Sequence, residues 1–562
     1  MPARELVTLR IEVPDRWARL QATSGCQYRV LRWQKQTHRK LADCWRYAHR
    51  KMISRREFVQ LATRTAAAAM LASTHDAATE QKGMQRATPR RGLPLLDLQQ
   101  RFVDLRFGMF VHFNMATFQD REWGDPTSSA DLFRPTALDT DQWGGAAQSA
   151  NMTWGCLTTR HHDGFCLWPT KTAAASVGQT LYSTDVVRAY VNSFRKAGLR
   201  VGLYYSILSL RDDIRHFNVT PSKVQLIKDQ LTELFTGYGE VDILITDGWN
   251  APWSRITYEE VPFHEIYEHI KNLQADCLIC DLNASQYPPS GLYYSDVKAF
   301  EQNAGQKVPE GSDVPALSCA TLTEGWFWKQ RDANAPLKPV KTVVDEWLRP
   351  LNLQHCNLIL NAPPNREGRL ASNLVSRLEE IGRAWTHPGP MTKLSKHVVI
   401  TTRNLATGKP IHASSYPDTV GPDEANDGDF HSSWYLEEGQ ISGWLEVDLQ
   451  KQESFNVVSL VEPVGKGDDY SESRIRSYRF ACWKGGTGLR LQTAKSLHLR
   501  QFIAFLAFHR RGCACCWRAA TRCLTLPRSA YMTNPTNQQQ RSLKSADLRC
   551  NHCAILSPRR QC

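Results

Sequence analysis

Short apolar runs alternate with longer segments of helical periodicity between about residues 95 and 388. The helical spacing is clearest at 184–197 and 221–238. Strands that alternate with helices predict a parallel sheet covered by helices, and about 290 residues is the size of a (β/α)8 TIM-like barrel with irregular loops. We therefore predict an α/β fold. The six strand-like runs are FGMFVHFN, WGCLTTRHH, LRVGLYYS, DILITDG, CLICDLN and NLILNAPP.

Polar side chains stand where these runs end. In a barrel of parallel strands the C-terminal ends converge on one mouth, so these side chains are expected to share a pocket. Each also has a simpler interpretation: a hydrogen-bonded structural histidine, a turn at Asp247-Gly248, or zinc ligation by a histidine pair whose adjacent side chains would point to opposite faces. One pocket accounts for all the strand ends together. They are His112, His161-His162-Asp163, Tyr204-Tyr205-Ser206, Asp247 and Asn361.

Six segments, in this order from about residue 95 to 384, resemble glycoside hydrolase family 29, the α-L-fucosidases. The HHDGF segment is specific by itself, and the ordered set is stronger. The resemblance implies a catalytic domain at 88–388 and hydrolysis without a metal or catalytic cofactor. The segments are RFVDLRFGMFVHFNMATF, Glu122-Trp123, LTTRHHDGFCLWPT, GLRVGLYYS, DILITDGWN and NLILNAPPNREGRL.

The resemblance also implies a retaining mechanism with Asp247 as nucleophile. A second carboxyl group, about 5–5.5 Å away, would protonate the leaving oxygen and later activate water. The histidines would bind fucose hydroxyls, and the indoles would contact apolar parts of the sugar. The implied substrate-binding residues are His112, Glu122, Trp123, His161, His162, Tyr204, Trp249 and Trp326.

The identity of the acid/base stays open at this point. Counting back from the WFW segment at 326–328, the position that holds a glutamate in many family members is Leu317, which has no proton to donate. Glu301 follows an apolar-aromatic pair, a setting that raises a carboxyl pKa, whereas Glu310 has Gly and Pro nearby. We predict Glu301, with Glu310 as the alternative. The remaining acids are Asp313 and Glu324.

The net charge of +13 is concentrated at the two ends of the chain. Residues 1–51 carry 12 basic and 4 acidic side chains, and residues 489–562 carry 13 basic and 1 acidic. The 437 residues between them have a net charge of −7, which argues against nucleic acid as the partner. We expect 1–51 to be a non-native or disordered extension and 489–562 a basic, Cys-rich disordered tail. Its Cys550 and Cys553 could alternatively bind zinc.

Residues 52–73 resemble a twin-arginine export signal. SRREFVQ at 54–60 fits the motif, and an alanine-rich stretch follows it. The alternative is an amphipathic surface helix, which Arg64 would suit. With 52–87 as signal region and linker, we expect a bacterial protein exported to the periplasm or the extracellular space. The sequence has no run of 18 or more apolar residues, so it does not predict a membrane span.

After a hinge near residue 388, short alternating strands separated by Gly, Asp and Pro predict a β-sandwich. The order GKP, ASS, ANDGD, SSW and WLEVDL resembles discoidin-like (factor V/VIII type C) domains. We expect a partial domain at 395–488. The ANDGD segment, 425–429, suits either a Ca²⁺ loop or an ordinary acidic turn.

The sequence thus predicts an exo-acting α-L-fucosidase that acts on fucosylated oligosaccharides or glycoconjugates. The alternative is a catalytically impaired fucose-binding protein on the same fold, which the missing glutamate at position 317 favours. Against it stands Asp247, because sugar binding alone does not require a nucleophile at a strand end. Linkage preference and oligomeric state are not predicted.

Overall fold

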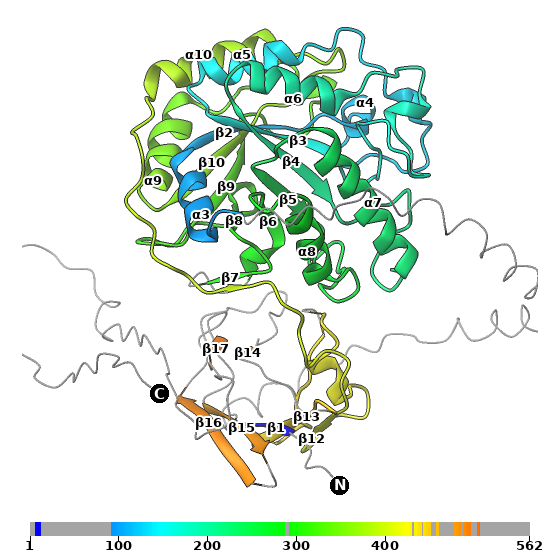
Figure 1. The fold of residues 1–562 in the computed structure, drawn as a ribbon, viewed down its shortest axis with the longest axis vertical. Coiled ribbons are helices and arrows are strands. Elements are labelled where there is room, and N and C mark those ends of the chain that lie inside the picture. The colour runs from blue at the N-terminus through cyan, green and yellow to red at the C-terminus, as the bar shows by residue number, and fades with distance from the viewer. Residues whose placement is uncertain are drawn as a thin grey trace, which may run out of the picture.

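The computed structural model describes residues 92–286, 291–429, 432–440 and 442–450, together with five strands at 6–12, 457–459, 477–484, 487–495 and 503–505. The predicted export signal and the cysteines of the tail lie outside these residues. The chain from 92 to 388 forms a nearly closed barrel, drawn from blue to light green in Figure 1.

Eight parallel strands form the barrel wall in the order β6-β5-β4-β3-β2-β10-β9-β8. The seam lies between β6 and β8, where the Asp296 amide donates to the Ile279 carbonyl at 2.7 Å. The strands are β2 (Phe107–Val111), β3 (Trp154–Arg160), β4 (Arg200–Ser206), β5 (Ile243–Asp247), β6 (Leu278–Asp281), β8 (Lys298–Glu301), β9 (Ala316–Thr321) and β10 (Cys356–Asn361).

Helices cover the outside of the wall between most strands (Figure 1). Among the described residues, the connections from β6 to β8 and from β8 to β9 contain only 3-10 turns and the short β7 (Leu292–Tyr293). The wall is therefore less covered here than in an ideal (β/α)8 barrel. The α-helices are α3 (Leu95–Asp104), α4 (Met115–Gln119), α5 (Thr140–Ser149), α6 (Val186–Lys196), α7 (Pro221–Gly237), α8 (Phe263–Leu273), α9 (Arg349–Asn352) and α10 (Ser372–Ala384).

The remaining short helices lie in loops, apart from a π-helix, η7 (Thr342–Leu348), that runs directly into α9. The 3-10 turns are η2 (Ala130–Leu132), η3 (Val177–Gln179), η4 (Leu282–Gln286), η5 (Gln302–Ala304), η6 (Gln330–Asp332) and η8 (Pro422–Ala425).

Two strands, β8 and β9, were not predicted. They are four and six residues long, and no helix separates them. Each is recognisable only from its pairing, β8 with β9 and β9 with β10. The six predicted strands and the helices at 184–197 and 221–238 are confirmed, the latter as α6 and α7.

Local sequence explains where these helices begin. The Asp185 carboxylate caps α6 by accepting from the Arg188 amide at 2.8 Å, and Thr220 caps α7 with Pro221 at the first helical position. Arg195 and Lys196 occupy the last turn of α6, where cations favour the helix dipole.

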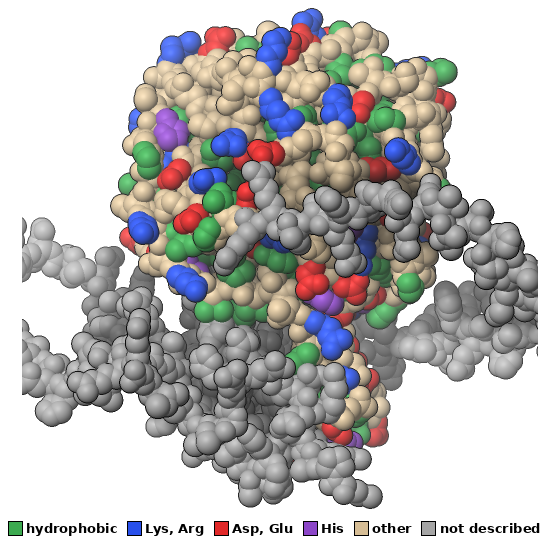
Figure 2. Space-filling model, viewed as in Figure 1, with side chains coloured by type: hydrophobic (Ala, Val, Ile, Leu, Met, Phe, Trp, Pro, Cys, Tyr) green, Lys and Arg blue, Asp and Glu red, His purple; other side chains and the backbone are tan. Residues whose placement is uncertain are grey.

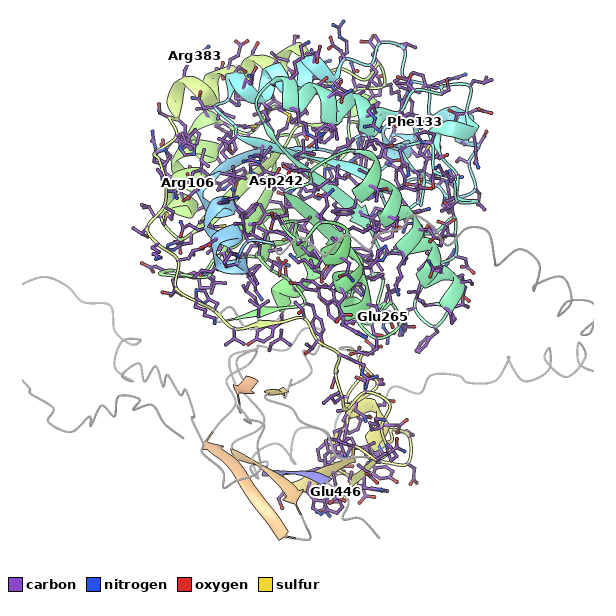
Figure 3. The ribbon with its side chains drawn as sticks, in the orientation of Figure 1. Arg106, Phe133, Asp242, Glu265, Arg383 and Glu446 are labelled. Atoms are coloured by element: carbon purple, nitrogen blue, oxygen red, sulfur yellow. The ribbon has the colours of Figure 1, made fainter. Side chains whose placement is uncertain are left out.

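Apolar side chains pack on both sides of the barrel wall. Inside it, a smaller apolar cluster includes Trp154, Tyr204 and Leu317. Between wall and helices lies the main core, where Phe133, labelled in Figure 3, packs edge-on against Phe113 with ring centroids 5.5 Å apart. This packing fixes the strand ends that carry the polar residues.

Gly155, the second residue of β3, gives a test of that packing. A Cβ at this position would meet the Phe194 ring of α6, so Gly155→Ala should lower the free energy of unfolding by about 1–3 kcal/mol. Gly145 on the exposed side of α5 has nothing within 4 Å of such a Cβ. Gly145→Ala is the control, and should raise stability because alanine is the better helix former. Urea unfolding measures both, and equal effects would contradict the packing argument.

Four strands that follow α10 and one from the N-terminal segment form a five-stranded antiparallel sheet in the order β12-β13-β1-β15-β16. The central strand β1 (Leu6–Glu12) comes from the N-terminal segment predicted as an extension. The strands β16 and β17 extend past the predicted boundary at 488. The other strands are β11 (Val399–Ile400), β12 (Ile411–Ala413), β13 (Ser442–Asp448), β14 (Val457–Ser459), β15 (Ser477–Lys484), β16 (Thr487–Lys495) and β17 (Ile503–Phe505).

Three further features belong to the described residues. Their helices include none long and apolar enough to cross a membrane. Basic and acidic side chains are interspersed over the barrel face seen in Figure 2. Free, buried thiols are found at Cys156, Cys166, Cys277, Cys280, Cys319 and Cys356.

Candidate active site

Asp247 ends β5, and two polar side chains hold its carboxylate. The Tyr204 hydroxyl at the end of β4 donates to Oδ2 at 2.9 Å, and the Asn283 amide, which follows β6, donates to Oδ1 at 2.8 Å. Burial raises the pKa of Asp247, while these two hydrogen bonds lower it. A carboxylate that is oriented on both oxygens, yet kept from full solvation, is suited to nucleophilic attack.

Three buried histidines lie beside this carboxylate. His162 Nε2 is 3.7 Å from Asp247 Oδ2, and its Nδ1 is 2.8 Å from Ser206 Oγ. His112 Nδ1 is 2.7 Å from the side-chain oxygen Oδ1 of Asn361, and the His161 ring stacks on the Tyr204 ring with centroids 5.7 Å apart.

Burial keeps all three histidines neutral at physiological pH. It lowers the pKa of His112 and of His162 to about 3, and the pKa of His161 also lies well below its usual value. A neutral imidazole both donates and accepts, which matches a sugar hydroxyl. His161 Nδ1 is buried without a hydrogen-bond partner, so it is available to a ligand.

Glu301 ends β8 and faces the same site. Its pKa is raised to about 7, first by burial and then by the negative charge of Asp247, while a hydrogen bond with Trp326 acts in the opposite direction. The two carboxyl groups are therefore electrostatically coupled. A carboxyl that stays protonated near neutral pH beside an ionised one fits a general acid paired with a nucleophile.

The WFW segment forms one wall of the site through main-chain contacts with Glu122. Glu122 Oε2 accepts from the Trp326 amide at 3.0 Å, and its other oxygen is paired with Lys329. The Trp326 ring lies 4.9 Å from His112, and the buried Phe327 ring lies 4.8 Å from His161. Glu122 thus supports this wall as well as facing the pocket.

Trp123 and Trp253 form an exposed aromatic pair with ring centroids 4.9 Å apart. Both lie against His162, at 4.6 and 4.4 Å. Trp253 comes from the loop between β5 and α8. The pair thus extends from the buried histidines to the surface.

Two of the predicted residues lie elsewhere. Trp249 is completely buried in the main core, stacks on Tyr258 and donates to the Val261 carbonyl at 2.9 Å. Gly248, with φ +102°, redirects the chain after Asp247, so the indole does not follow the carboxylate into the site. Glu310 is exposed on a loop and lacks the burial that an acid/base needs.

Three side chains of the site were missed: Asn283, Phe327 and Trp253. Asn283 stands two residues after the apolar run CLICD, so the strand-end rule could have found it. Of the WFW segment, only Trp326 was predicted to bind the substrate. Nothing in the sequence around Trp253 distinguishes it from Trp249.

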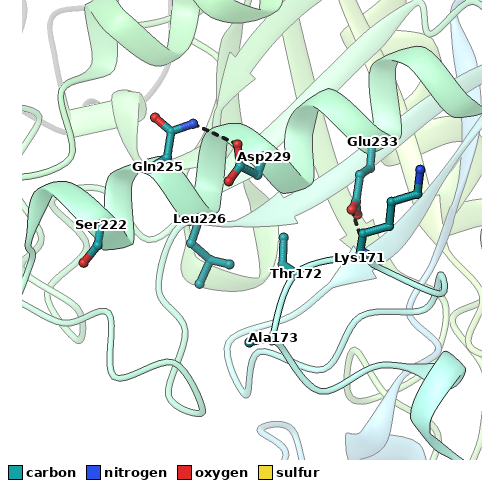
Figure 4. Close-up of a pocket in the computed structure, with 8 residues that line it drawn as sticks. All are labelled: Lys171, Thr172, Ala173, Ser222, Gln225, Leu226, Asp229 and Glu233. Atoms are coloured by element: carbon teal, nitrogen blue, oxygen red, sulfur yellow. Dashed lines mark hydrogen bonds between the residues drawn. The ribbon is translucent and has the colours of Figure 1, made fainter. Parts of the chain in front are cut away.

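Two surface cavities of similar size differ in their place in the fold and in the residues that line them. One, of about 480 Å³, is lined by Glu301, Glu122 and Trp326 and opens at the mouth of the barrel. The other, of about 490 Å³, lies along α7, where Glu233 accepts from the Lys171 amide and Gln225 donates to Asp229 (Figure 4). The second cavity lacks a buried carboxyl or histidine from the strand ends.

Two carboxyl groups with separated roles, neutral histidines and aromatic walls form a site that can cleave a glycosidic bond. Residues 74–388 match the family model described as Alpha-L-fucosidase. This chain belongs to the α-L-fucosidase family. It is therefore a glycoside hydrolase, and the family assignment from sequence is confirmed.

Relatives of known name agree with the family. The chain is 27% identical to α-L-fucosidase 1 of Arabidopsis thaliana over 70% of its own length and 78% of that protein. It is similar to the solved α-L-fucosidase isoenzyme 1 of Paenibacillus thiaminolyticus (21% identity, 63% and 99% of the two chains, TM-score 0.45). It also resembles a glycoside hydrolase 29 family member from an unknown rumen bacterium (24% identity, 51% and 56%, TM-score 0.44), of which it spans little more than half.

Proposed function

We propose that this chain is an exo-acting α-L-fucosidase that removes terminal α-linked L-fucose from glycoconjugates with retention of configuration. The observation that carries the proposal is the oriented Asp247 carboxylate beside Glu301, whose pKa is about 7. Buried neutral histidines with indoles next to them suit a 6-deoxy sugar, which has several hydroxyls and one methyl group.

In the first step, Asp247 Oδ attacks the anomeric carbon and the bond to the leaving oxygen breaks. Glu301 gives its proton to that oxygen, which leaves as an alcohol. In the second step Glu301, now a carboxylate, takes a proton from water, and the water oxygen displaces Asp247 from the sugar. Fucose is released, Glu301 is again protonated and Asp247 is again a carboxylate.

No catalytic metal or cofactor is proposed. Export remains a proposal that rests on the sequence at 52–73 alone. The rival interpretation, a fucose-binding protein, rested on Leu317. In the structure Leu317 belongs to the apolar cluster inside the barrel, and Glu301 on the neighbouring strand faces the site instead.

The test is hydrolysis of an aryl α-L-fucoside by the full chain, with fucose binding measured by calorimetry in parallel. We expect turnover and, by NMR, α-L-fucose as the first product. Release of β-L-fucose first would contradict retention. A folded protein that binds fucose and cleaves nothing would instead support the binding-protein alternative.

A further inference from the structure

The loop between β5 and α8, residues 248–262, carries Trp253 to the mouth of the site. Its inner side is anchored by Trp249, whose indole donates to Val261, and by Ser254, whose hydroxyl donates to the Gly248 carbonyl. Its tip is anchored less from within, because Trp253 is 43% exposed.

The outer side of this loop is held by a segment that follows the barrel. Arg255, two residues after Trp253, is paired with the buried carboxylate of Asp429. His216, from the loop between β4 and α7, lies between that carboxylate (3.6 Å) and Glu260 (2.8 Å). Glu260 also accepts from the Thr257 amide at 2.9 Å, so a hydrogen bond within the loop supports the carboxylate that His216 contacts.

The backbone on each side is held in an uncommon conformation. Arg255 has φ +56°, which a non-glycine residue adopts only when its surroundings impose it. Gly428, beside Asp429, has φ +88° and approaches the Glu259 carboxylate so closely that a Cβ would meet it at 2.6 Å. The two segments are thus fitted to each other.

These contacts also bear on the predicted calcium loop at 425–429. Asp427 accepts from the Asp429 amide at 2.8 Å and from the Ser432 hydroxyl at 2.7 Å, while Asp429 is occupied by a guanidinium. A cation beside Arg255 would be repelled, and among the described residues no group of three or more His, Cys, Asp or Glu side chains is arranged to hold a metal ion. The acidic residues of this turn therefore fit a contact with the barrel and do not fit a calcium site.

We propose that Asp429 is a positioning residue through which the post-barrel segment holds the Trp253 loop against the leaving-group sugar; this rests on the proposed fucosidase function. Because Glu301 lines the cavity at the barrel mouth, a leaving oxygen that it protonates would face solvent, and we expect the sugar beyond it to extend across the mouth. There the exposed indole of Trp253 offers a flat apolar surface to the C–H face of a pyranose.

The test compares two substrates that differ only in the leaving group. α-L-Fucosyl fluoride has no sugar beyond the scissile bond, whereas a fucosyl-galactose disaccharide does. Asp429→Asn should lower kcat/KM for the disaccharide about tenfold, mainly through KM, and leave fluoride hydrolysis within about twofold. Arg255→Gln breaks the same pair from the barrel side and should give the same split, and it replaces Asp429→Asn if that variant misfolds.

Two further variants separate positioning from general damage. The double variant Asp429→Asn/Trp253→Ala should have the same kcat/KM for the disaccharide as Trp253→Ala alone, because both changes remove the same contact with the sugar. Asp345→Asn breaks an Asp–Arg pair with Arg349 that is more exposed and lies away from the site, where η7 joins α9, and it should change hydrolysis of neither substrate. An equal loss on both substrates, or no loss on the disaccharide, overturns the proposal. Failure of the parent protein to cleave either substrate overturns the proposed function instead.

Discussion

Asp247→Ala should lower kcat for an aryl α-L-fucoside by at least about 10³-fold, because the covalent intermediate can no longer form. Tyr204 and Asn283, which orient the carboxylate, would remain in place, so substrate binding should survive. Added azide can enter the space left by the carboxylate and attack the anomeric carbon from the same face. The expected product is β-L-fucosyl azide, which NMR distinguishes from the α anomer.

Asp242, which directly precedes β5, provides the control. It pairs with Arg200 at 3.3 Å and lies at the N-terminal side of β5, whereas Asp247 is the last residue of that strand. Asp242→Asn should therefore keep kcat within about twofold, whatever it does to stability. If Asp247→Ala kept substantial activity without azide, or if azide gave the α product, Asp247 would not be the nucleophile.

The barrel mouth could be predicted because its residues directly follow apolar runs. His112, His161 and Asp247 need only the rule that parallel strands end at one edge. Trp249 shows the limit of that rule, because the positive φ of Gly248 turns the chain away one residue after Asp247. Local sequence does not specify which indole then reaches the surface, since tertiary packing decides it.

The weakest predictions concerned the part of the wall with the shortest strands. The acid/base stayed open because β8 has only four residues and was not recognised as a strand. Once it pairs with β9, Glu301 becomes a strand-end residue like Asp247, and Leu317 becomes a core residue. The contact of Asp429 with Arg255 spans 174 positions and could not be predicted from local patterns.

Glu301→Gln should lower kcat/KM about 10²–10⁴-fold for a disaccharide, whose leaving oxygen needs a proton, and less for an activated aryl fucoside. For aryl substrates the intermediate should accumulate, because water is no longer activated. Azide needs no general base, so it should restore turnover and give α-L-fucosyl azide, the anomer opposite to that expected with Asp247→Ala. Glu310→Gln, on an exposed loop, should leave all of these values unchanged.

The pH profile gives a second readout. The acid must be protonated, so kcat/KM of the parent should fall as the pH rises through about 7, the pKa of Glu301. On the acid side it should fall as Asp247 is protonated, at a pH above the usual range of an aspartate because burial raises its pKa. Glu301→Gln should abolish the alkaline limb and keep the acid limb. Since Asp247 and Glu301 are coupled, Asp247→Asn should also lower the pKa of Glu301, which NMR titration of the variant can measure. An alkaline limb that persists in Glu301→Gln would show that another group donates the proton.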